Sequence, residues 1–397
     1  MDDFSSQVRH PRGNCDELQA RIESMLISPL NVQEKLWEVM LSSGKYGSCG
    51  AVPLTLDRSS NLERETLILF RVHHAICDGV SMSSVLGDLT DESDSLHKNA
   101  LDEKEKFMDV IVKNNVIWIC KIVLYYFVGG LWAIVLQFWR MMFSINPFDD
   151  IIKQSQSSCN SRPRSICWRH LGSMNEIKAV TKAISQRTTL NDLAVTLVSA
   201  AIRMQLEVHS KTKKIVIPDT VNVVIPVHLD KGLIHTGNEI GNKIGAFVTS
   251  IPIDKTRSKL LRVTTVSKKL NEGKITPAPK IAWMIAKFLS DYTPKSFAKV
   301  AMIKANAQSV VVISNIRGFP SPVHWLGRHV QVLCAFLPLP PGIPIGIMIM
   351  SYAGNVSFSV NADSRAVPDA EQFASWMIEE FNSLKKEVRV KDACSLA

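Results

Sequence analysis

The first apolar pattern in the chain has helical spacing. Its side chains recur every three or four positions, which places them on one face of a helix; they are Leu18, Ile22, Met25 and Leu26. Charged and polar residues occupy most of the positions between them. We therefore predict a helix from Leu18 to Val39.

The next pattern, from Leu67 to His74, alternates with a period of two and predicts a strand. Ile68, Phe70 and Val72 would share one face with His74, and this face is apolar until it reaches the histidine. Gly79 then permits a tight turn. Ser81 is placed to cap a short helix that runs to about Leu89.

The second half of the chain mixes helical and strand patterns, and most of its strands come late. Helices are predicted after the capping box of Ser173 and Glu176, along the stripe that begins at Leu190, and from Asp369 to the C-terminus. Strand patterns cover residues 221–227, 309–314, 345–352 and 356–360. This irregular alternation predicts an α/β or α+β chain with a mixed sheet.

Residues 116–145 form the most apolar segment. No charge occurs from Ile122 to Trp139, a run of 18 residues and long enough for a membrane-spanning helix. Gly129-Gly130 near its middle favours a turn, and each flanking piece is too short to cross a bilayer. We expect residues 116–145 to form a helical hairpin or an apolar element in the plane of the membrane, with a buried connecting helix as the alternative. The composition of residues 155–164 predicts a linker.

Composition restricts the class of protein. A hydrophobic content of 46% excludes a disordered chain. The net charge is +9, but lysine and arginine are scattered among acidic residues, which argues against a nucleic-acid partner. None of the eight cysteines forms a CxxC pair, so neither a zinc module nor a disulfide framework is indicated. The polar N-terminus lacks the apolar core of a signal peptide.

The sharpest candidate for chemistry is the sequence HHAICDG at residues 73–79. Adjacent histidines on a strand point to opposite faces, so His73 and His74 cannot chelate one metal ion together. A neutral imidazole can activate a hydroxyl near neutral pH, and the alternation selects His74. Asp78 could orient an imidazole, or lock the loop through an arginine or backbone donors. A purely structural pair of hydrogen-bonded histidines is the alternative.

The pattern HHxxxDG resembles the signature of the CoA-dependent acyltransferase superfamily. Further landmarks resemble one branch, the bacterial and plant wax ester synthase/diacylglycerol acyltransferase family, and they occur in the family's order. They are Leu36-Trp37 (PLW, with Lys35 for proline), Asn191-Asp192 (ND), Pro226-Val227 with Gly241-Asn242 (PV…GN, with His228 and Asp230 as departures), Ser314–Gly318 (SNVPG, with Arg317 for proline) and Ser351-Tyr352 with Gly354 and Asp363.

The resemblance implies a fold of two lobes with mixed sheets and a tunnel between them, similar to chloramphenicol acetyltransferase. Residues 1–115 would form a partial N-terminal lobe, residues 116–165 the apolar membrane-associating segment and linker, and residues 166–397 the C-terminal lobe. Family members begin with a further stretch that includes the first sheet strand, and we expect this chain to lack it.

The resemblance also implies the reaction. A long-chain acyl group would pass from acyl-CoA to a fatty alcohol or diacylglycerol, with His74 as general base and His73, Asp78 and Gly79 completing the motif. No metal and no cofactor beyond the acyl-CoA substrate is required. Oxyanion or substrate candidates are Asn191, Asp192, Ser314 and Asn315, although Asn191 and Asp192 could be helix caps alone and Ser314 and Asn315 could serve only the turn.

Two other functions stay open: transfer to a different acceptor, and non-catalytic lipid binding at a membrane surface. Because acyl-CoA is available in the cytosol, we expect both lobes to face the cytosol. The apolar element would attach them to a membrane, that of the endoplasmic reticulum or otherwise the plasma membrane. The sequence indicates no oligomeric state.

Overall fold

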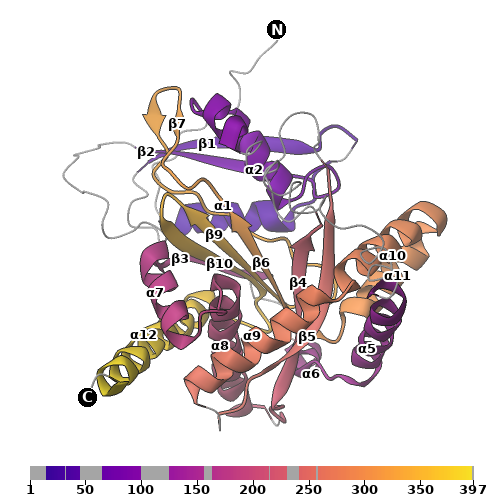
Figure 1. Ribbon diagram of the computed structural model, residues 1–397. Coiled ribbons are helices and arrows are strands. Elements are labelled where there is room, and N and C mark those ends of the chain that lie inside the picture. Colours follow the sequence, from indigo (N-terminus) through magenta and orange to yellow (C-terminus); the bar gives the residue numbers. More distant parts are fainter. Residues whose placement is uncertain are drawn as a thin grey trace, which may run out of the picture.

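The computed structural model describes residues 15–31, 33–44, 65–99, 125–155, 163–213, 215–229, 241–255 and 258–395. Parts of two predicted segments, residues 116–124 and 156–162, lie outside this description. The remaining elements form a mixed α/β structure built around a central sheet (Figure 1).

The N-terminal elements are α1 (Cys15–Ile27), β1 (Trp37–Gly44), β2 (Glu65–Val72) and α2 (Gly79–Asp88). β1 and β2 pair antiparallel, and Glu38 forms a 2.8 Å ion pair with its cross-strand neighbour Arg71. The predicted helix over 18–39 is therefore wrong beyond Ile27. Pro29 disfavours continuation of the helix, and pairing with β2 makes the segment from Trp37 a strand.

The central sheet has six strands in the order β3-β10-β9-β6-β4-β5. Their bounds are Arg164–Ser173 (β3), Thr220–His228 (β4), Ile244–Pro252 (β5), Ser309–Arg317 (β6), Ile345–Tyr352 (β9) and Asn355–Asp363 (β10). β6 runs parallel to both of its neighbours, whereas the other pairs are antiparallel. The sheet is thus mixed, as predicted. A small hairpin, β7 (His324–Trp325) and β8 (Arg328–His329), stands apart from it.

Four helices accompany the sheet and supply much of its core. They are α7 (Met174–Ile184), α8 (Leu190–Ser210), α9 (Lys259–Ile275) and α12 (Ala370–Ser395). α8 and α12 pack on each other, and Leu197, Phe373 and Leu384 are fully buried between sheet and helices. Burial of such side chains stabilises a fold by about 1.5–3 kcal/mol each, so this layer holds most of the hydrophobic stabilisation.

The remaining helices are η2, a π-helix (Tyr125–Gly129), followed by α5 (Gly130–Phe143), α6 (Pro147–Gln154), α10 (Ala278–Tyr292) and α11 (Lys295–Asn306). α10 packs on the edge strand β5 and contacts α5 and α11 (Figure 1), whereas α6 packs near the end of α8 and the start of β6. Among the described residues, no helix combines the length and apolarity needed to cross a bilayer.

The predicted turn at Gly129-Gly130 is wrong. Gly129 has helical angles (φ −67°, ψ −34°), and η2 continues into α5 without a break in the chain direction. A Cβ at Gly129 would lie 3.3 Å from Cδ of Pro277, and one at Gly130 would lie 3.0 Å from Cδ1 of Ile281. The two glycines therefore allow close packing against the start of α10.

Candidate active site

The loop of residues 73–79 joins β2 to α2, and Asp78 anchors its C-terminal end. The carboxylate caps α2, because Oδ1 accepts hydrogen bonds from the backbone amides of Val80 (3.0 Å) and Ser81 (2.9 Å). The predicted cap Ser81 is instead the third residue of the helix. Oδ2 of Asp78 accepts from the backbone amide of Lys243 at 2.9 Å, and Nε2 of His228 lies 3.4 Å away.

The electrostatics of this anchor favour an ionised carboxylate. Asp78 is only 1% exposed, and burial alone would raise its pKa. The hydrogen bonds from His228, Ser81 and Lys243 outweigh that effect and hold the pKa of Asp78 well below its usual range. Asp78 therefore stays charged at neutral pH, and backbone donors with His228 take the place of the arginine considered from the sequence.

The two histidines lie just beyond the end of β2, which stops at Val72. The alternation used to select His74 therefore ends before it reaches either ring, and both side chains are exposed. Nδ1 of His73 accepts a hydrogen bond from the amide of Ala75 at 3.3 Å. His74 is held by the Asn242 amide, whose Nδ2 lies 3.0 Å from both Nδ1 and the carbonyl oxygen of His74.

Gly79 brings this loop against the central sheet. A Cβ at this position would lie 2.3 Å from Cδ1 of Ile316, near the end of β6. Gly241 provides a second support, since its carbonyl accepts from the amide of Asp78 (3.1 Å) and the hydroxyl of Ser81 (2.9 Å). The loop is thus fixed on two segments that lie more than 150 residues further along the chain.

Of the other candidate residues, Asn191 and Asn315 form a hydrogen-bonded pair, and Asp192 belongs to a helix cap. Nδ2 of Asn315 donates to Oδ1 of Asn191 at 2.7 Å, joining the end of β6 to the start of α8. Asp192 is fully buried and forms a capping box with Thr189. The structure therefore brings Asn191 and Asn315 together and gives Asp192 the capping role. Ser314 is half-buried within β6.

Two residues that contact the motif, Asn242 and His228, had no assigned role in the sequence. Asn242 belongs to the Gly241-Asn242 landmark, and that landmark was the available signal. His228 stands where the family pattern is broken, so nothing in the sequence paired it with Asp78. Cys77 is a poor nucleophile, because burial and the charge of Asp78 raise the pKa of its thiol to about 11.

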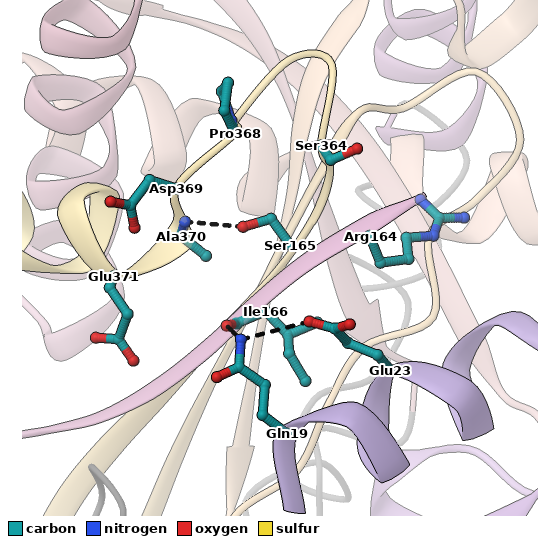
Figure 2. Close-up of a pocket in the computed structure, with 10 residues that line it drawn as sticks. All are labelled: Gln19, Glu23, Arg164, Ser165, Ile166, Ser364, Pro368, Asp369, Ala370 and Glu371. Atoms are coloured by element: carbon teal, nitrogen blue, oxygen red, sulfur yellow. Dashed lines mark hydrogen bonds between the residues drawn. The ribbon is translucent and has the colours of Figure 1, made fainter. Parts of the chain in front are cut away.

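One cavity, of about 300 Å³, lies away from this loop. Figure 2 shows it between α1, β3 and the start of α12, where Gln19 donates to the carbonyl of Ile166 and the amide of Ala370 donates to Ser165. It contains none of the candidate catalytic residues. Within the described part of the chain, no three His, Cys, Asp or Glu side chains group as a metal site.

Comparisons with known proteins identify similar chains. A family model described as the WS/DGAT C-terminal domain matches residues 240–385. A probable diacylglycerol O-acyltransferase of Mycobacterium tuberculosis is 21% identical, over 93% of this chain and 75% of its own length. Wax ester synthase/diacylglycerol acyltransferase 2 of Arabidopsis thaliana is 22% identical, over 92% and 76%.

A solved structure shares the fold. The wax ester synthase/diacylglycerol acyltransferase from Marinobacter aquaeolei VT8 superposes with a TM-score of 0.55, covering 98% of this chain and 81% of its own, at 15% identity. The predicted α/β fold class with a mixed sheet is confirmed.

Proposed function

We infer that this chain, which belongs to the wax ester synthase/diacylglycerol acyltransferase family, moves a long-chain acyl group from acyl-CoA to a fatty alcohol or diacylglycerol. The observation that carries the proposal is the position of His74. Its ring is exposed, yet it is held by Asn242 on a loop that Asp78 fixes to the C-terminal half. An accessible imidazole on a fixed backbone suits a general base.

In the proposed reaction Nε2 of His74 takes the proton of the acceptor hydroxyl. The alkoxide oxygen attacks the thioester carbonyl, and the tetrahedral intermediate collapses as the C–S bond breaks. The proton passes from His74 to the leaving CoA sulfur, so the products are an ester and free CoA. For Nε2 to act as a base, the neutral ring must carry its proton on Nδ1. Nδ1 is then a donor, so the side-chain amide of Asn242 must rotate until its oxygen, rather than its nitrogen, faces Nδ1.

We propose Asn315 as the donor to the oxyanion of that intermediate. One hydrogen of its amide is used by Asn191, which fixes the side chain and leaves the second hydrogen for a developing negative charge. Asn191 is then a positioning residue. Ser314 precedes Asn315 in β6, so its side chain points to the opposite face of the strand and is not a donor to the same oxyanion. Asp192 holds the helix that carries Asn191.

The substrates and the division into lobes are part of the same proposal. Acyl-CoA is a substrate, and the chemistry uses no cofactor. Residues 1–115 and 166–397 act together, joined by residues 116–165, because the His73-His74 loop rests on residues of the second half. We place the protein at the cytosolic face of the endoplasmic reticulum, where acyl-CoA and apolar acceptors meet.

The test is an acyl-transfer assay on the purified chain with radiolabelled palmitoyl-CoA, and with hexadecanol or dioleoylglycerol dispersed in detergent. We expect labelled wax ester or triacylglycerol and free CoA in equal amounts. Turnover with phenols or amines alone would reassign the acceptor. Lipid binding without turnover, in a folded protein, would support the non-catalytic alternative and contradict the proposal.

A further inference from the structure

Helices from two parts of the chain, residues 125–143 and 278–306, lie together at the β5 edge of the molecule. We call this region the outer helical face and define it as η2 with α5, α10 and α11. α10 contacts both α5 and α11, and α5 also contacts α11 (Figure 1). Lys280 of α10 lies over the ring of Tyr126 in η2, 5.2 Å from its centre. The face is therefore one connected surface.

Large apolar side chains on this face are open to solvent. In η2 and α5, Phe127 is 74% exposed and both Leu131 and Trp132 are 62% exposed. In α10 and α11 the exposed set continues with Met284, Ile285, Phe288, Tyr292, Phe297, Val300, Met302 and Ile303. An apolar surface spread over several helices is uncommon on a soluble monomer and marks an interaction site.

Charge identifies the partner. Residues 278–306 contain five lysines, at 280, 287, 295, 299 and 304, and one acidic residue, Asp291. That carboxylate forms an ion pair with Lys287 at 3.0 Å. Residues 125–143 carry a single charge, Arg140. The face therefore combines apolar and aromatic groups with an excess of positive charge.

A bilayer with anionic headgroups matches this combination better than a protein does. Tyrosine and tryptophan favour the membrane interface, and the long stems of lysine can lie along apolar surface while the ammonium groups reach the phosphates. A symmetric dimer through the same face would bring the lysines of one copy toward those of the other. We propose that the outer helical face docks on a membrane that contains anionic phospholipids.

The docking surface adjoins the candidate active site. Nε1 of Trp283, on α10, donates to the carbonyl of Asn242 at 3.4 Å, and Asn242 in turn contacts His74. Gly245 at the start of β5 approaches α10 so closely that a Cβ would lie 2.0 Å from the carbonyl oxygen of Pro279. Docking would place the His74 loop beside the bilayer, from which an apolar acceptor could enter; that last step alone rests on the proposed function.

The charge component is tested by flotation with phosphatidylcholine vesicles, with and without phosphatidylserine, in the absence of substrate. The variant combines Lys295→Gln, Lys299→Gln and Lys304→Gln. Because each lysine near an anionic surface strengthens binding about fivefold, we expect the loss of three lysines to lower the partition coefficient on phosphatidylserine vesicles about 100-fold. Weak binding to pure phosphatidylcholine should stay unchanged.

A matched control removes the same charge elsewhere. Lys178 and Lys182 on α7 and Lys211 after α8 are exposed, and they belong to none of the helices that form the outer helical face. The combination Lys178→Gln, Lys182→Gln and Lys211→Gln should bind phosphatidylserine vesicles as the unmodified protein does. Equal losses in both triple variants would mean that net charge alone drives binding, and the proposed surface would be wrong.

The apolar component is tested with Trp132→Ser combined with Phe288→Ser, both on exposed side chains. Binding to both kinds of vesicle should fall at least tenfold, whereas Val216→Ser with Leu326→Ser, also at exposed positions, should have no effect. Unchanged binding would overturn the proposal. So would a stable dimer in gel filtration that the Trp132/Phe288 variant dissociates, together with failure of the unmodified protein to float. Acyl transfer is measured separately, in detergent.

Discussion

The N-termini of α2 and α8 have similar hydrogen-bond arrangements but different roles in the protein. Each has a buried aspartate that accepts from the backbone near the helix start. Asp78 precedes α2 and accepts from two amides within it, whereas Asp192, the third residue of α8, accepts from the amide of Thr189. In each, an exposed or half-buried polar side chain lies close by: His74 in the first case, and in the second Asn191, which positions Asn315. Both motifs thus separate the group that fixes the backbone from the group that serves the proposed chemistry.

The two aspartates differ in how many of their carboxylate oxygens form hydrogen bonds and in the partners that they bind. Both oxygens of Asp78 are engaged, and one of them accepts from Lys243, so the cap also ties the loop to a distant segment. Asp192 uses one oxygen for Thr189 and Ser267, and within the described residues its Oδ1 has no hydrogen-bond partner. We infer that Asp78 assembles the candidate active site, whereas Asp192 holds the start of α8 and joins it to α9 through Ser267.

The largest effect on the turnover number is expected at His74, the exposed side chain near the start of α2. His74→Ala should lower the turnover number by about 10² to 10⁴ while leaving the fold intact, because it removes the base and no buried contact. The measurement is CoA release with a thiol reagent, together with thermal unfolding. His73→Ala should cost much less. If His73→Ala abolished activity in a folded protein and His74→Ala did not, the roles of the two rings would be reversed.

Asp78→Asn should reduce both stability and turnover. The amide can keep one capping bond, but its NH₂ group would face the backbone N–H of Lys243, and such a buried mismatch costs about 1–3 kcal/mol of unfolding free energy. Urea unfolding at neutral pH measures this loss. An Asp78→Asn protein as stable as the unmodified one would show that the cap does not assemble the loop.

The same aspartate predicts a pH dependence. Its pKa is lower in the folded protein than in the unfolded chain, so its contribution to stability is present above the unfolded value of about 4. That contribution is lost as the pH falls further, towards the folded pKa. The difference in unfolding free energy between the unmodified protein and Asp78→Asn should therefore shrink below about pH 4.

Gly79→Ala tests whether the loop rests on the sheet. The new methyl group would meet Cδ1 of Ile316, and such overpacking costs about 1–3 kcal/mol. Ile316→Val removes that atom. We expect the double variant to be more stable than the sum of the single changes predicts, by about 1 kcal/mol. Strict additivity in denaturant unfolding would mean that the loop and β6 do not touch.

Asn242→Ala should lower the turnover number by about tenfold, the effect of losing a residue that orients the base rather than the base itself. KM and thermal stability should change little, because Asn242 is exposed. Trp283→Phe is the matched control: it removes the donor to the Asn242 carbonyl and leaves the contact to His74. A rise in KM with unchanged turnover would instead assign Asn242 to substrate binding.

The smallest effect on catalysis is expected at the second cap. Asp192→Asn weakens the capping box with Thr189 and should cost about 1 kcal/mol of stability. The turnover number of the folded protein should fall by less than a factor of about three, since the change acts on the start of α8 and its contact with α9 rather than on the base. A loss comparable to that of His74→Ala would place Asp192 in the chemistry and remove the distinction between the two caps.

The sequence alone determined the elements whose signals are local. The strands β4, β6, β9 and β10 and the helices α8 and α12 follow from apolar periodicity within their own segments, and Ser173 begins its helix as predicted. The motif at residues 73–79 could also be identified from its residue types. Its local geometry differs from the prediction, because Gly79 is the first residue of α2 rather than part of a turn, and Asp78 rather than Ser81 caps that helix.

Only the tertiary structure decided features that depend on distant partners. The segment from Trp37 became a strand because β2 pairs with it, and Gly129-Gly130 stayed helical because α10 packs on it. The contacts of His74 with Asn242 and of Asn191 with Asn315 span 168 and 124 residues. Spacing within one segment cannot specify such pairs, since the free energy that forms them comes from burial and strand pairing across the whole fold.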